Sequence, residues 1–568
     1  RLFEKADFED GPAYSELHLL NAQGVSRPLI TERSGVSGLS FAADNRHLTF
    51  LSKRSGDKFT SLYRMPIDGG EAQRILSFAS NVRGYALSPK GERVAFLATP
   101  PEEKERARLQ KLGFQAQVFE EDWKNVQLYL ATPGRDTVDP RPIAIQGSLG
   151  EVHWSPDGAR LAVTVAPNPG VDADLMYRKI HILDAQSGQT KTTLKNPGKL
   201  GQIAFSPDGR QLAFLTGEDL HDPDNGRLWV ADTSTGQTRD LWPNLDARVT
   251  KVDWIGNQRL RVLLWKGLVS EVWDVGLDGS KSKVVEAGEE VITDLACSGD
   301  GQRSLYLSES PKHPGEVFWQ EGQQTPRRMT RLNPELDKLS WARQEAFEYK
   351  ARDGQNIQGV LIHPKDAQAG KRYPLIMWVH GGPESLIHNS WLNYYSMPGQ
   401  VAAARGFAVF YPNYRGSIGR SVAFSKLGQK DPAGREFEDL VDGVDALIAK
   451  GLVDGDKVGV TGGSYGGYAT AWCSTFYSHR FAAGVMSVGI SDKISKSGTT
   501  DIPDEEFLVH ARQRPWEAWN FMMERSPIHH VQKHKTPLLI MHGKEDPRVH
   551  PSQSLELFRY LKMMDQAP

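Results

Sequence analysis

A serine surrounded by glycines stands in the stretch VGVTGGSYGGYAT, residues 458–470. Gly462, Ser464 and Gly466 fit the pattern G-x-S-x-G, in which a sharp turn between a strand and a helix exposes a serine hydroxyl for nucleophilic attack. Glycine suits the flanking positions because side chains there would collide with the strand and the helix. An ordinary glycine-rich turn with a bystander serine is the alternative, so the surrounding elements must decide.

Apolar runs alternate with helical segments after about residue 340. The runs are PLIMWVHGG, FAVFYPNY, KVGVTGG, AAGVMSVG and PLLIMHG, and they predict a parallel sheet covered on both faces. The segment 431–451 predicts one covering helix, because its apolar residues recur at helical spacing and Gly451 ends it. Ser464 is therefore expected at the carboxyl end of a strand, where ligands bind in such folds. This context favours the nucleophile over the bystander.

The first 340 residues repeat one design. FAADNRHLTFLS, LSPKGERVAFLA, WSPDGARLAVTV and FSPDGRQLAFLT each place a polar turn between two short apolar runs, and weaker copies follow at 254–265 and 297–308. This is the hairpin signature. A repeat every 40–50 residues or so is typical of a β-propeller, with about four strands in each blade. Dividing the length by the period predicts seven blades, one of them incomplete or closed by both chain ends.

One repeat is too long. The excess includes PEEKERARLQKLGFQAQVFEED at 101–122, a charged segment rich in helix formers, which predicts a solvated helix that leaves its blade. The expected organisation is a β-propeller on residues 1–340 followed by an α/β-hydrolase domain on residues 341–568.

Composition excludes several classes of function. The formal net charge is -2, with 68 basic and 70 acidic side chains, so nothing indicates a nucleic-acid partner. No apolar run approaches the ~20 residues that span a bilayer. The two cysteines, Cys297 and Cys473, fit neither a disulfide framework nor a metal site, and no metal or cofactor is expected. RLFEKADFED is not a signal peptide, and the compartment stays open between the cytoplasm and export by a leader outside these residues.

A serine nucleophile needs partners. In α/β-hydrolases the triad acid follows the serine along the chain, after a later strand, and the loop after the expected strand 538–541 contains Glu545 and Asp546. The oxyanion of the tetrahedral intermediate needs preorganised donors. The backbone N–H of Tyr465 is one candidate, and the loop HGGP, His380–Pro383, offers the other because its glycines let the backbone approach a substrate closely.

The motifs WVHGGP, GGSYGGY and HGKEDPRVHPSQS, behind a β-propeller, resemble the prolyl oligopeptidase family of serine peptidases. The acylaminoacyl-peptidase and dipeptidyl-aminopeptidase-like branches have the most similar pattern. The resemblance implies Ser464 as nucleophile, Asp546 as triad acid, and the amides of Gly382 and Tyr465 as the oxyanion hole. It also implies that Arg548 binds a substrate carbonyl or carboxylate, although a salt bridge at the rim is the alternative role.

One expected group is missing. The family's catalytic histidine follows the acid by about thirty residues, but only 22 residues follow Asp546 here. His550 stands four residues after the acid, in the same loop, and is not assigned as the base. The catalytic histidine is expected beyond Pro568, and these residues alone are expected to be almost inactive. The remaining candidates are expected to be structural: His380, His529, His530, His534 and His542.

Three functions remain open. The leading hypothesis is a serine peptidase acting on short peptides, with a propeller that excludes folded proteins. The alternatives are a carboxylesterase with the same nucleophile and a non-catalytic propeller scaffold. Family dipeptidyl peptidases hold the substrate's free amine with paired glutamates, a role that Glu120 and Glu121 are predicted to fill. Endo- or exopeptidase action, side-chain preference and assembly into a homo-oligomer are not readable.

Overall fold

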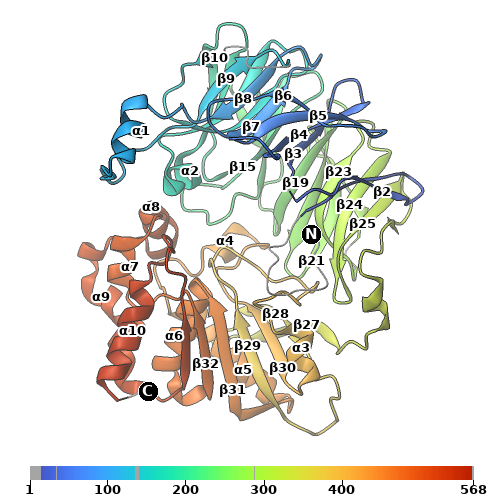
Figure 1. Ribbon diagram of the computed structural model, residues 1–568. Helices are drawn as coiled ribbons and strands as arrows, with labels where there is room; N and C mark the ends of the chain where they lie inside the picture. The colour runs from blue at the N-terminus through green and yellow to red at the C-terminus, as the bar shows by residue number, and fades with distance from the viewer. Residues whose placement is uncertain (1–14, 34, 135–139, 287, 566–568) are drawn as a thin grey trace. The chain divides into compact units, whose positions relative to one another are not determined.

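The computed structural model describes residues 15–33, 35–134, 140–286 and 288–565 (Figure 1). They form two compact units. The first takes its residues from 1–196, 203–213 and 230–239, and the second from 197–202, 214–229 and 240–568. The sheets change character between β26 (Arg327–Arg328) and β27 (Gln344–Lys350), while the predicted domain ranges 1–340 and 341–568 stay a prediction.

The N-terminal repeats form a β-propeller, as predicted. Each four-stranded sheet pairs strands that follow one another along the chain. The first three sheets are β3 (Ser37–Phe41), β4 (His47–Ser52), β5 (Ser61–Pro66) and β6 (Gln73–Leu76); β7 (Val82–Leu87), β8 (Val94–Ala98), β9 (Gln127–Ala131) and β10 (Arg141–Ile143); and β11 (Ser148–Trp154), β12 (Arg160–Ala166), β13 (Lys179–Asp184) and β14 (Thr190–Leu194).

The other three sheets continue the pattern. They are β15 (Leu200–Phe205), β16 (Gln211–Thr216), β17 (Arg227–Asp232) and β18 (Thr238–Asp240); β19 (Arg248–Ile255), β20 (Arg259–Lys266), β21 (Val269–Gly276) and β22 (Lys281–Val285); and β23 (Val291–Cys297), β24 (Arg303–Ser310), β25 (His313–Glu321) and β26.

The described residues hold six four-stranded sheets, one fewer than the predicted seven blades. Before them, β1 (Leu17–Leu20) and β2 (Ser26–Ile30) form a two-stranded sheet. The prediction of seven blades divided the whole length by the repeat period, so it counted the residues that connect the sheets as parts of a blade. Residues 99–126 separate β8 from β9 and contain the predicted helix, which is α1 (Lys104–Lys111), and residues 329–343 lie between β26 and β27.

The second unit contains a seven-stranded sheet in the order β27-β28-β30-β29-β31-β32-β33. Its strands after β27 are β28 (Asn356–Ile362), β29 (Tyr373–Val379), β30 (Ala408–Asn413), β31 (Val453–Gly463), β32 (Ala483–Ser487) and β33 (Leu538–Met541). The pairs from β30 to β33 are parallel, and β27, β28 and β30 pair antiparallel. This is the α/β-hydrolase arrangement that the alternating pattern predicts.

Alternate residues of β29 pack on opposite faces of this sheet. Leu375, Met377 and Val379 join the core built with α5 (Arg435–Ala449) and α6 (Tyr465–Thr475), whereas Ile376 and Trp378 pack with α3 (Gly399–Ala404). The period of two is the ordinary strand alternation. The predicted helix over 431–451 is thus confirmed as α5, and Gly451 after it has a φ of +77°.

The remaining helices are short apart from α10. They are α2 (Val171–Tyr177), α4 (Val422–Ser425), α7 (Lys493–Thr499), α8 (Pro503–Glu505), α9 (Trp519–Glu524) and α10 (Ser552–Met563), with the single π-turn η3 (Glu506–Ala511) and the 3₁₀ segments η1 (Pro334–Lys338), η2 (Ser478–Arg480), η4 (Pro515–Glu517) and η5 (Pro527–Lys533).

Candidate active site

Ser464 occupies a sharp turn between β31 and α6. Its backbone has φ 58° and ψ -120°, a combination that residues with side chains rarely adopt and that marks strained functional turns. The side chain is half-buried, and its hydroxyl has no hydrogen-bond partner among the residues that the structure describes. The hydroxyl is therefore left free to react.

Close packing explains the glycines of this turn. A Cβ on Gly462 would lie 2.4 Å from the carbonyl oxygen of Val379, and one on Gly466 would lie 2.0 Å from the same oxygen. A Cβ on Gly467 would lie 2.5 Å from the carbonyl oxygen of Ser487. Real Cβ atoms do not approach backbone this closely, so the turn can exist only with glycine at these positions.

The HGGP loop lies directly against the nucleophile turn. A Cβ on Gly381 would lie 3.2 Å from the Cβ of Ser464 and 3.7 Å from the backbone nitrogen of Tyr465. Gly382 is exposed and has a φ of +115°. The loop therefore brings the backbone of both predicted oxyanion donors, Gly382 and Tyr465, to the neighbourhood of the serine.

His380 anchors this loop from its other side. The Tyr414 hydroxyl donates to the carbonyl oxygen of His380 at 2.9 Å, and the imidazole Nε2 pairs with the Ser417 hydroxyl at 2.9 Å. Burial lowers the pKa of His380 to about 4, so the ring is neutral near pH 7. The histidine has the structural role that was predicted.

Asp546 lies in the loop that follows β33. Its Oδ1 accepts hydrogen bonds from the backbone N–H groups of Arg548 (2.9 Å) and Val549 (3.0 Å). Within the described residues its Oδ2 accepts none: His542 Nε2 is 3.8 Å away and bonds instead to the Val549 carbonyl oxygen at 2.7 Å. The loop thus fixes the carboxylate with one oxygen and leaves the other free to orient a base.

The three motifs follow the carboxyl ends of strands in one sheet, so they lie at the same end of its strands. Val379 at the end of β29 pairs with Gly462, Gly463 pairs with Ser487, and Ser487 pairs with Met541 at the end of β33. The serine and acid loops are thus two strands apart, about 10 Å at the usual strand spacing. A base that contacts both residues must therefore lie between the two loops.

His550 is not placed as a base. It is exposed, and its Nδ1 pairs with the Ser552 hydroxyl at 3.0 Å. Three other histidines were predicted to be structural: His530 and His534 pair with the carbonyl oxygens of Glu524 and Ser474, and His529 packs edge-on against His530.

Arg548 forms an ion pair with Asp501, with Nε 2.5 Å from Oδ1. The backbone joins the same two segments, because the Asp501 N–H donates to the Pro547 carbonyl oxygen and the Thr500 hydroxyl donates to that of Arg548. The arginine thus has the salt bridge that was its alternative role, while its predicted part in binding a substrate stays a prediction.

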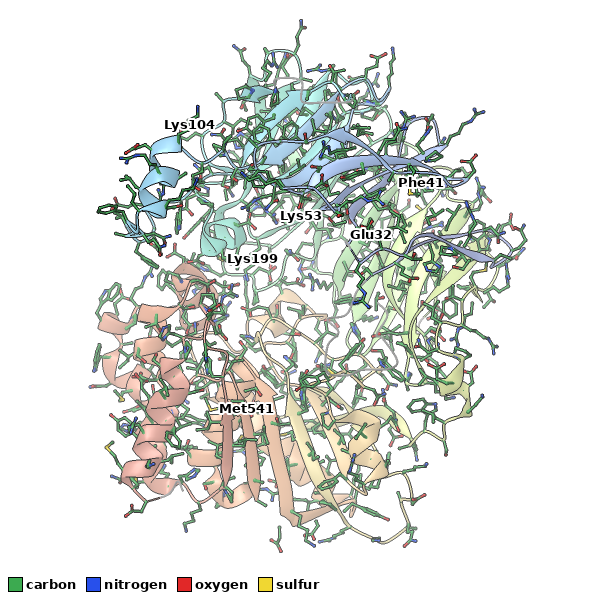
Figure 2. The ribbon with its side chains drawn as sticks, in the orientation of Figure 1. Glu32, Phe41, Lys53, Lys104, Lys199 and Met541 are labelled. Atoms are coloured by element: carbon green, nitrogen blue, oxygen red, sulfur yellow. The ribbon has the colours of Figure 1, made fainter. Side chains whose placement is uncertain are left out.

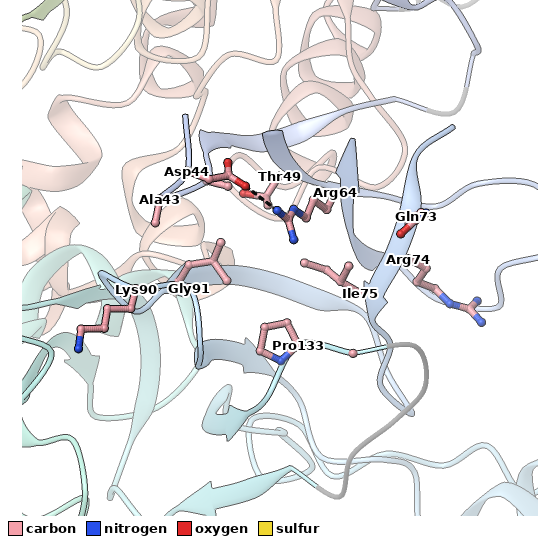
Figure 3. Close-up of a pocket in the computed structure, with 13 residues that line it drawn as sticks. Ala43, Asp44, Thr49, Arg64, Gln73, Arg74, Ile75, Lys90, Gly91 and Pro133 are labelled. Atoms are coloured by element: carbon pink, nitrogen blue, oxygen red, sulfur yellow. Dashed lines mark hydrogen bonds and ion pairs between the residues drawn. The ribbon is translucent and has the colours of Figure 1, made fainter. Parts of the chain in front are cut away.

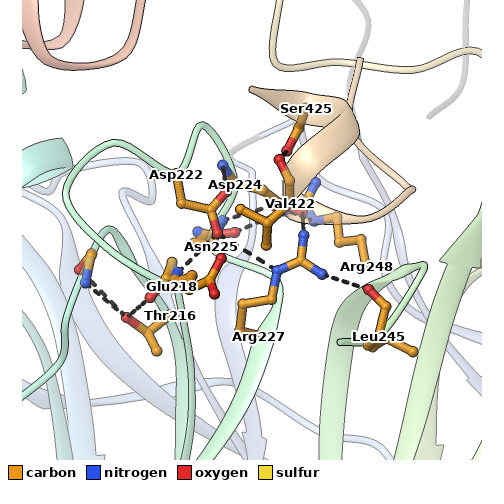
Figure 4. Close-up of polar contacts among 12 residues, drawn as sticks. Thr216, Glu218, Asp222, Asp224, Asn225, Arg227, Leu245, Arg248, Val422 and Ser425 are labelled. Carbon is orange, nitrogen blue, oxygen red and sulfur yellow. Dashed lines mark hydrogen bonds and ion pairs between the residues drawn. The ribbon is translucent and has the colours of Figure 1, made fainter. Parts of the chain in front are cut away.

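Glu120 and Glu121, the predicted amine ligands, are exposed and belong to the first unit. A buried acidic pair exists in the second unit, at Asp222 and Asp224 (Figure 4). Arg248 lies 3.1 Å from Asp224, and Arg227 lies 3.6 Å from Asp222. Two arginines thus balance two acids, which leaves no excess negative charge for a substrate amine.

A hollow of the first unit has none of the predicted site residues in its lining. It has a volume of about 700 Å³ and is lined by residues such as Asp44, Arg64, Arg74 and Lys90 (Figure 3). The Asp44–Arg64 ion pair (2.6 Å) forms part of its lining. Across the described residues, no three His, Cys, Asp or Glu side chains gather as a metal would require, and no helix has the length and apolar character to cross a membrane.

The sequence analysis missed a buried ionic contact beside the HGGP loop. His510 Nε2 lies 2.6 Å from Glu384 Oε1, and its Nδ1 lies 3.0 Å from Glu506 Oε2. Glu384 and His510 are 126 residues apart, so no spacing in the sequence links them. The only signal was the position of Glu384 directly after HGGP.

Comparison with known proteins agrees with this geometry. Residues 393–567 match the prolyl oligopeptidase family. The matched region includes Ser464 and Asp546, and the HGGP loop lies just before it.

Two curated relatives and one solved structure match almost the whole of this chain. Dipeptidyl-peptidase 5 of Porphyromonas gingivalis is 25% identical over 97% of this chain and 84% of its own length. The peptidase YuxL of Bacillus subtilis is 27% identical over 92% of this chain and 83% of its own length. An acylaminoacyl peptidase structure from Pyrococcus horikoshii is 21% identical and superposes with a TM-score of 0.80 over 97% of this chain and 85% of that one, which shows the shared fold.

Proposed function

We propose that this protein is a serine peptidase that hydrolyses short peptides through an acyl-enzyme, with Ser464 as nucleophile and Asp546 as triad acid. The observation that carries the proposal is the strained turn at Ser464, with φ 58°, an unbonded hydroxyl and the HGGP backbone against it. The family match over the same region supports the reaction class.

The chemistry follows from the groups present. The Ser464 oxygen attacks the carbonyl carbon of the scissile bond, and the base takes the hydroxyl proton. The oxyanion accepts hydrogen bonds from the Gly382 and Tyr465 amides, which stabilise the tetrahedral intermediate. When the C–N bond breaks, the base returns the proton to the leaving amine; water then hydrolyses the acyl-enzyme and restores the serine. Asp546 Oδ2 orients the base throughout.

The proposed base is a histidine beyond Pro568. The exposure of β33 on one face of the sheet supports a further segment that would cover this face. Leu539 and Met541 of β33 are 57% and 46% exposed, and the stick view places Met541 on this strand (Figure 2). They alternate with Leu538 and Ile540, which pack towards α10.

The same face holds an apolar hollow of about 690 Å³, lined by residues of β29, β31 and β32 such as Ile376, Thr461 and Val485. Parallel sheets are stable when both faces are covered. A strand beside β33 and a helix over this hollow would complete the sheet, and the loop between them would reach the gap between Ser464 and Asp546.

Relatives suggest an exopeptidase. The names of the P. gingivalis and P. horikoshii proteins describe release of dipeptides and of acylated amino acids, and either activity is proposed here as the substrate class. A carboxylesterase would use the same nucleophile, and a scaffold would use none. Size selection by the propeller and amine binding by Glu120 and Glu121 are parts of the proposal that only substrates can test.

The test uses the full protein, including whatever sequence follows Pro568. A fluorophosphonate probe should label Ser464, and the Ser464→Ala variant should lose both labelling and peptide hydrolysis, by roughly a million-fold as in a comparable serine protease. A panel of otherwise identical peptides assigns the substrate class. Some have a free N-terminus, some an acetylated N-terminus, and some place the scissile bond far from either end. A protein that hydrolyses aryl esters but none of the peptides would favour the esterase. An unlabelled, inactive protein would favour the scaffold.

A further inference from the structure

Several buried charged side chains adjoin the candidate site. The buried charge cluster, as we name it, comes from three elements: the loop after β29, α7 and η3. Its members are Glu384, Lys493, Lys496, Glu506 and His510. All are buried except Glu384, whose side chain is 15% exposed. Charges that are buried so deeply must compensate one another, so their arrangement is specific.

His510 is the centre of this cluster. Its two ring nitrogens face Glu384 Oε1 at 2.6 Å and Glu506 Oε2 at 3.0 Å. Because an ionised carboxylate only accepts hydrogen bonds, both nitrogens must donate, and the ring is an imidazolium. Burial opposes this charge, but the two carboxylates outweigh it and raise the pKa of His510 to about 10.

Both carboxylates are held in the ionised form. Burial would raise the pKa of Glu384, but His510 and then Lys199 lower it to about 2. Glu506 is bonded to Lys493 and lies 3.5 Å from Lys496, and these cations, with His510, hold its pKa well below the ordinary value despite burial. The ionic contacts of His510 therefore persist across the neutral range.

The imidazolium contacts the segments that carry both predicted oxyanion donors. Glu384 follows Gly382 by two residues, in a turn so tight that a Cβ on Gly382 would lie 2.2 Å from the Glu384 nitrogen. On its other side the His510 ring packs edge-to-face against the ring of Tyr465, with centroids 5.9 Å apart. The Tyr465 hydroxyl in turn donates to Glu436 at 2.7 Å.

We propose that His510 is a positioning residue, which fixes the Gly382 and Tyr465 amides of the oxyanion hole through Glu384 and through the Tyr465 ring. This inference rests on the proposed peptidase function. Loss of one oxyanion donor costs about 10²–10³ in kcat in a serine protease, so loosening both donors without removing either should cost less. The substrate's ground state should be bound almost as before.

Other titratable groups also face His510 and its two carboxylates. They are Lys493 and Lys496 on α7, Tyr465 on α6 with Glu436 of α5 behind it, and Lys199, which pairs with Glu505 next to Glu506. None of these cations touches the ring directly, so the two carboxylates dominate its titration.

The experiment compares His510→Asn, Glu384→Gln and the double variant in the full protein with a peptide substrate. We expect kcat to fall about 10- to 100-fold in His510→Asn, with KM changed less than two-fold, and the affinity of a peptide boronate that mimics the tetrahedral state to fall in parallel. The double variant should be no worse than His510→Asn, because both changes break one contact.

The matched control is His313→Asn. His313 is also buried and also pairs with a carboxylate, Nε2 to Glu290 Oε1 at 3.0 Å, but it lies on β25 of the propeller. We expect it to change stability and not kcat. An unchanged kcat in folded His510→Asn and Glu384→Gln would overturn the proposal, as would a loss that appears only in KM.

The pH profile separates positioning from general destabilisation. As pH rises through about 10, wild-type kcat should fall because the imidazolium loses its proton and one of its two carboxylate contacts. Glu384→Gln removes one carboxylate, so this alkaline limb should move to lower pH, and in His510→Asn it should be absent. An alkaline limb at the same pH in all three proteins would contradict the proposal. If His510→Asn does not fold, Glu384→Gln alone decides.

Failure of the positioning role of His510 can be distinguished from failure of the proposed peptidase function. If wild type neither hydrolyses peptides nor reacts with a fluorophosphonate at Ser464, the peptidase proposal falls. If wild type does both and the variants match it in kcat, boronate affinity and pH profile, only the role of His510 falls.

Discussion

The hairpin turns of the propeller and the turn at Ser464 both combine serine with glycine, yet they are held together differently. In three blades, Ser155, Ser206 and Ser298 each donate to an aspartate two residues later and accept from a backbone N–H five residues later. Those turns stabilise themselves. The Ser464 turn is fixed by distant neighbours, Val379, Gly381 and Ser487, and its hydroxyl makes no bond among the described residues.

The contrast separates a structural serine from a reactive one. Where a turn uses its own side chains, the hydroxyl is consumed and the sequence motif repeats. Where packing from other strands imposes the turn, the hydroxyl is free, and the backbone can be strained because the surrounding structure determines it. The predictions below test this difference, from the largest expected effect to the smallest.

The largest effect should come from Gly466→Ala. Its Cβ would lie 2.0 Å from the carbonyl oxygen of Val379, so the variant should lose at least about 4 kcal/mol of unfolding free energy or fail to fold. The comparison is Gly91→Ala in a blade turn, where φ is +73° and nothing lies within 4 Å of the added atom; there only the left-handed backbone costs about 1 kcal/mol. Denaturant unfolding of both variants gives the difference, and equal losses would refute the distinction.

Asp439→Asn tests a buried charge of the hydrolase part. Asp439 bonds Arg415 through both carboxylate oxygens, at 2.6 and 2.9 Å, and both residues are buried. Arg415 also bonds Asp353, at 2.7 and 3.0 Å, so the variant removes one of two carboxylate partners and should cost about 1.5–3 kcal/mol. Glu105→Gln in the exposed pair with Arg108 on α1 should leave chemical unfolding unchanged. A small effect at Asp439 would mean that Asp353 alone compensates the charge of Arg415.

Glu436→Gln should change how stability depends on pH. Burial raises the pKa of Glu436 to about 8, so the native fold favours the neutral acid. Wild type should therefore lose stability relative to the variant as pH rises from about 4.5 to 8, by about 1.4 kcal/mol for each unit of pKa difference, and then level off. Blade-turn carboxylates such as Asp208 have a lowered pKa and should respond in the opposite sense, losing stability only in acid. Parallel curves for wild type and variant between pH 4.5 and 8 would contradict this.

The smallest effect should come from Ser206→Ala, which removes the hydrogen bonds that the hydroxyl makes with Asp208 and with the backbone of Gln211, and which should cost about 1 kcal/mol. Ser155→Ala should cost the same amount. Ser464→Ala should cost nothing in thermal unfolding, because its hydroxyl has no bond to lose. A destabilised Ser464→Ala would show that this serine supports its turn as the blade serines do.

Local patterns made most of the fold predictable. The turn at Ser464, the strand Leu538–Met541 and the helix α5 each follow from residues close together in the sequence. The blade count was wrong because a period cannot tell blade residues from connecting ones. The contact of His510 with Glu384 and the pairing of Arg548 with Asp501 depend on which loops the sheet order brings together. No spacing along one chain encodes that.

The half-covered strand β33 has one more consequence. Within the described residues it pairs on one side only, with β32, and an unpaired edge offers a row of backbone donors and acceptors to any extended peptide. Residues 1–568 should therefore bind a separately synthesised peptide that carries the proposed adjoining strand, the proposed histidine and the proposed covering helix. Activity restored by mixing two polypeptides, neither of which hydrolyses anything alone, would turn the enzyme into a reporter of molecular association.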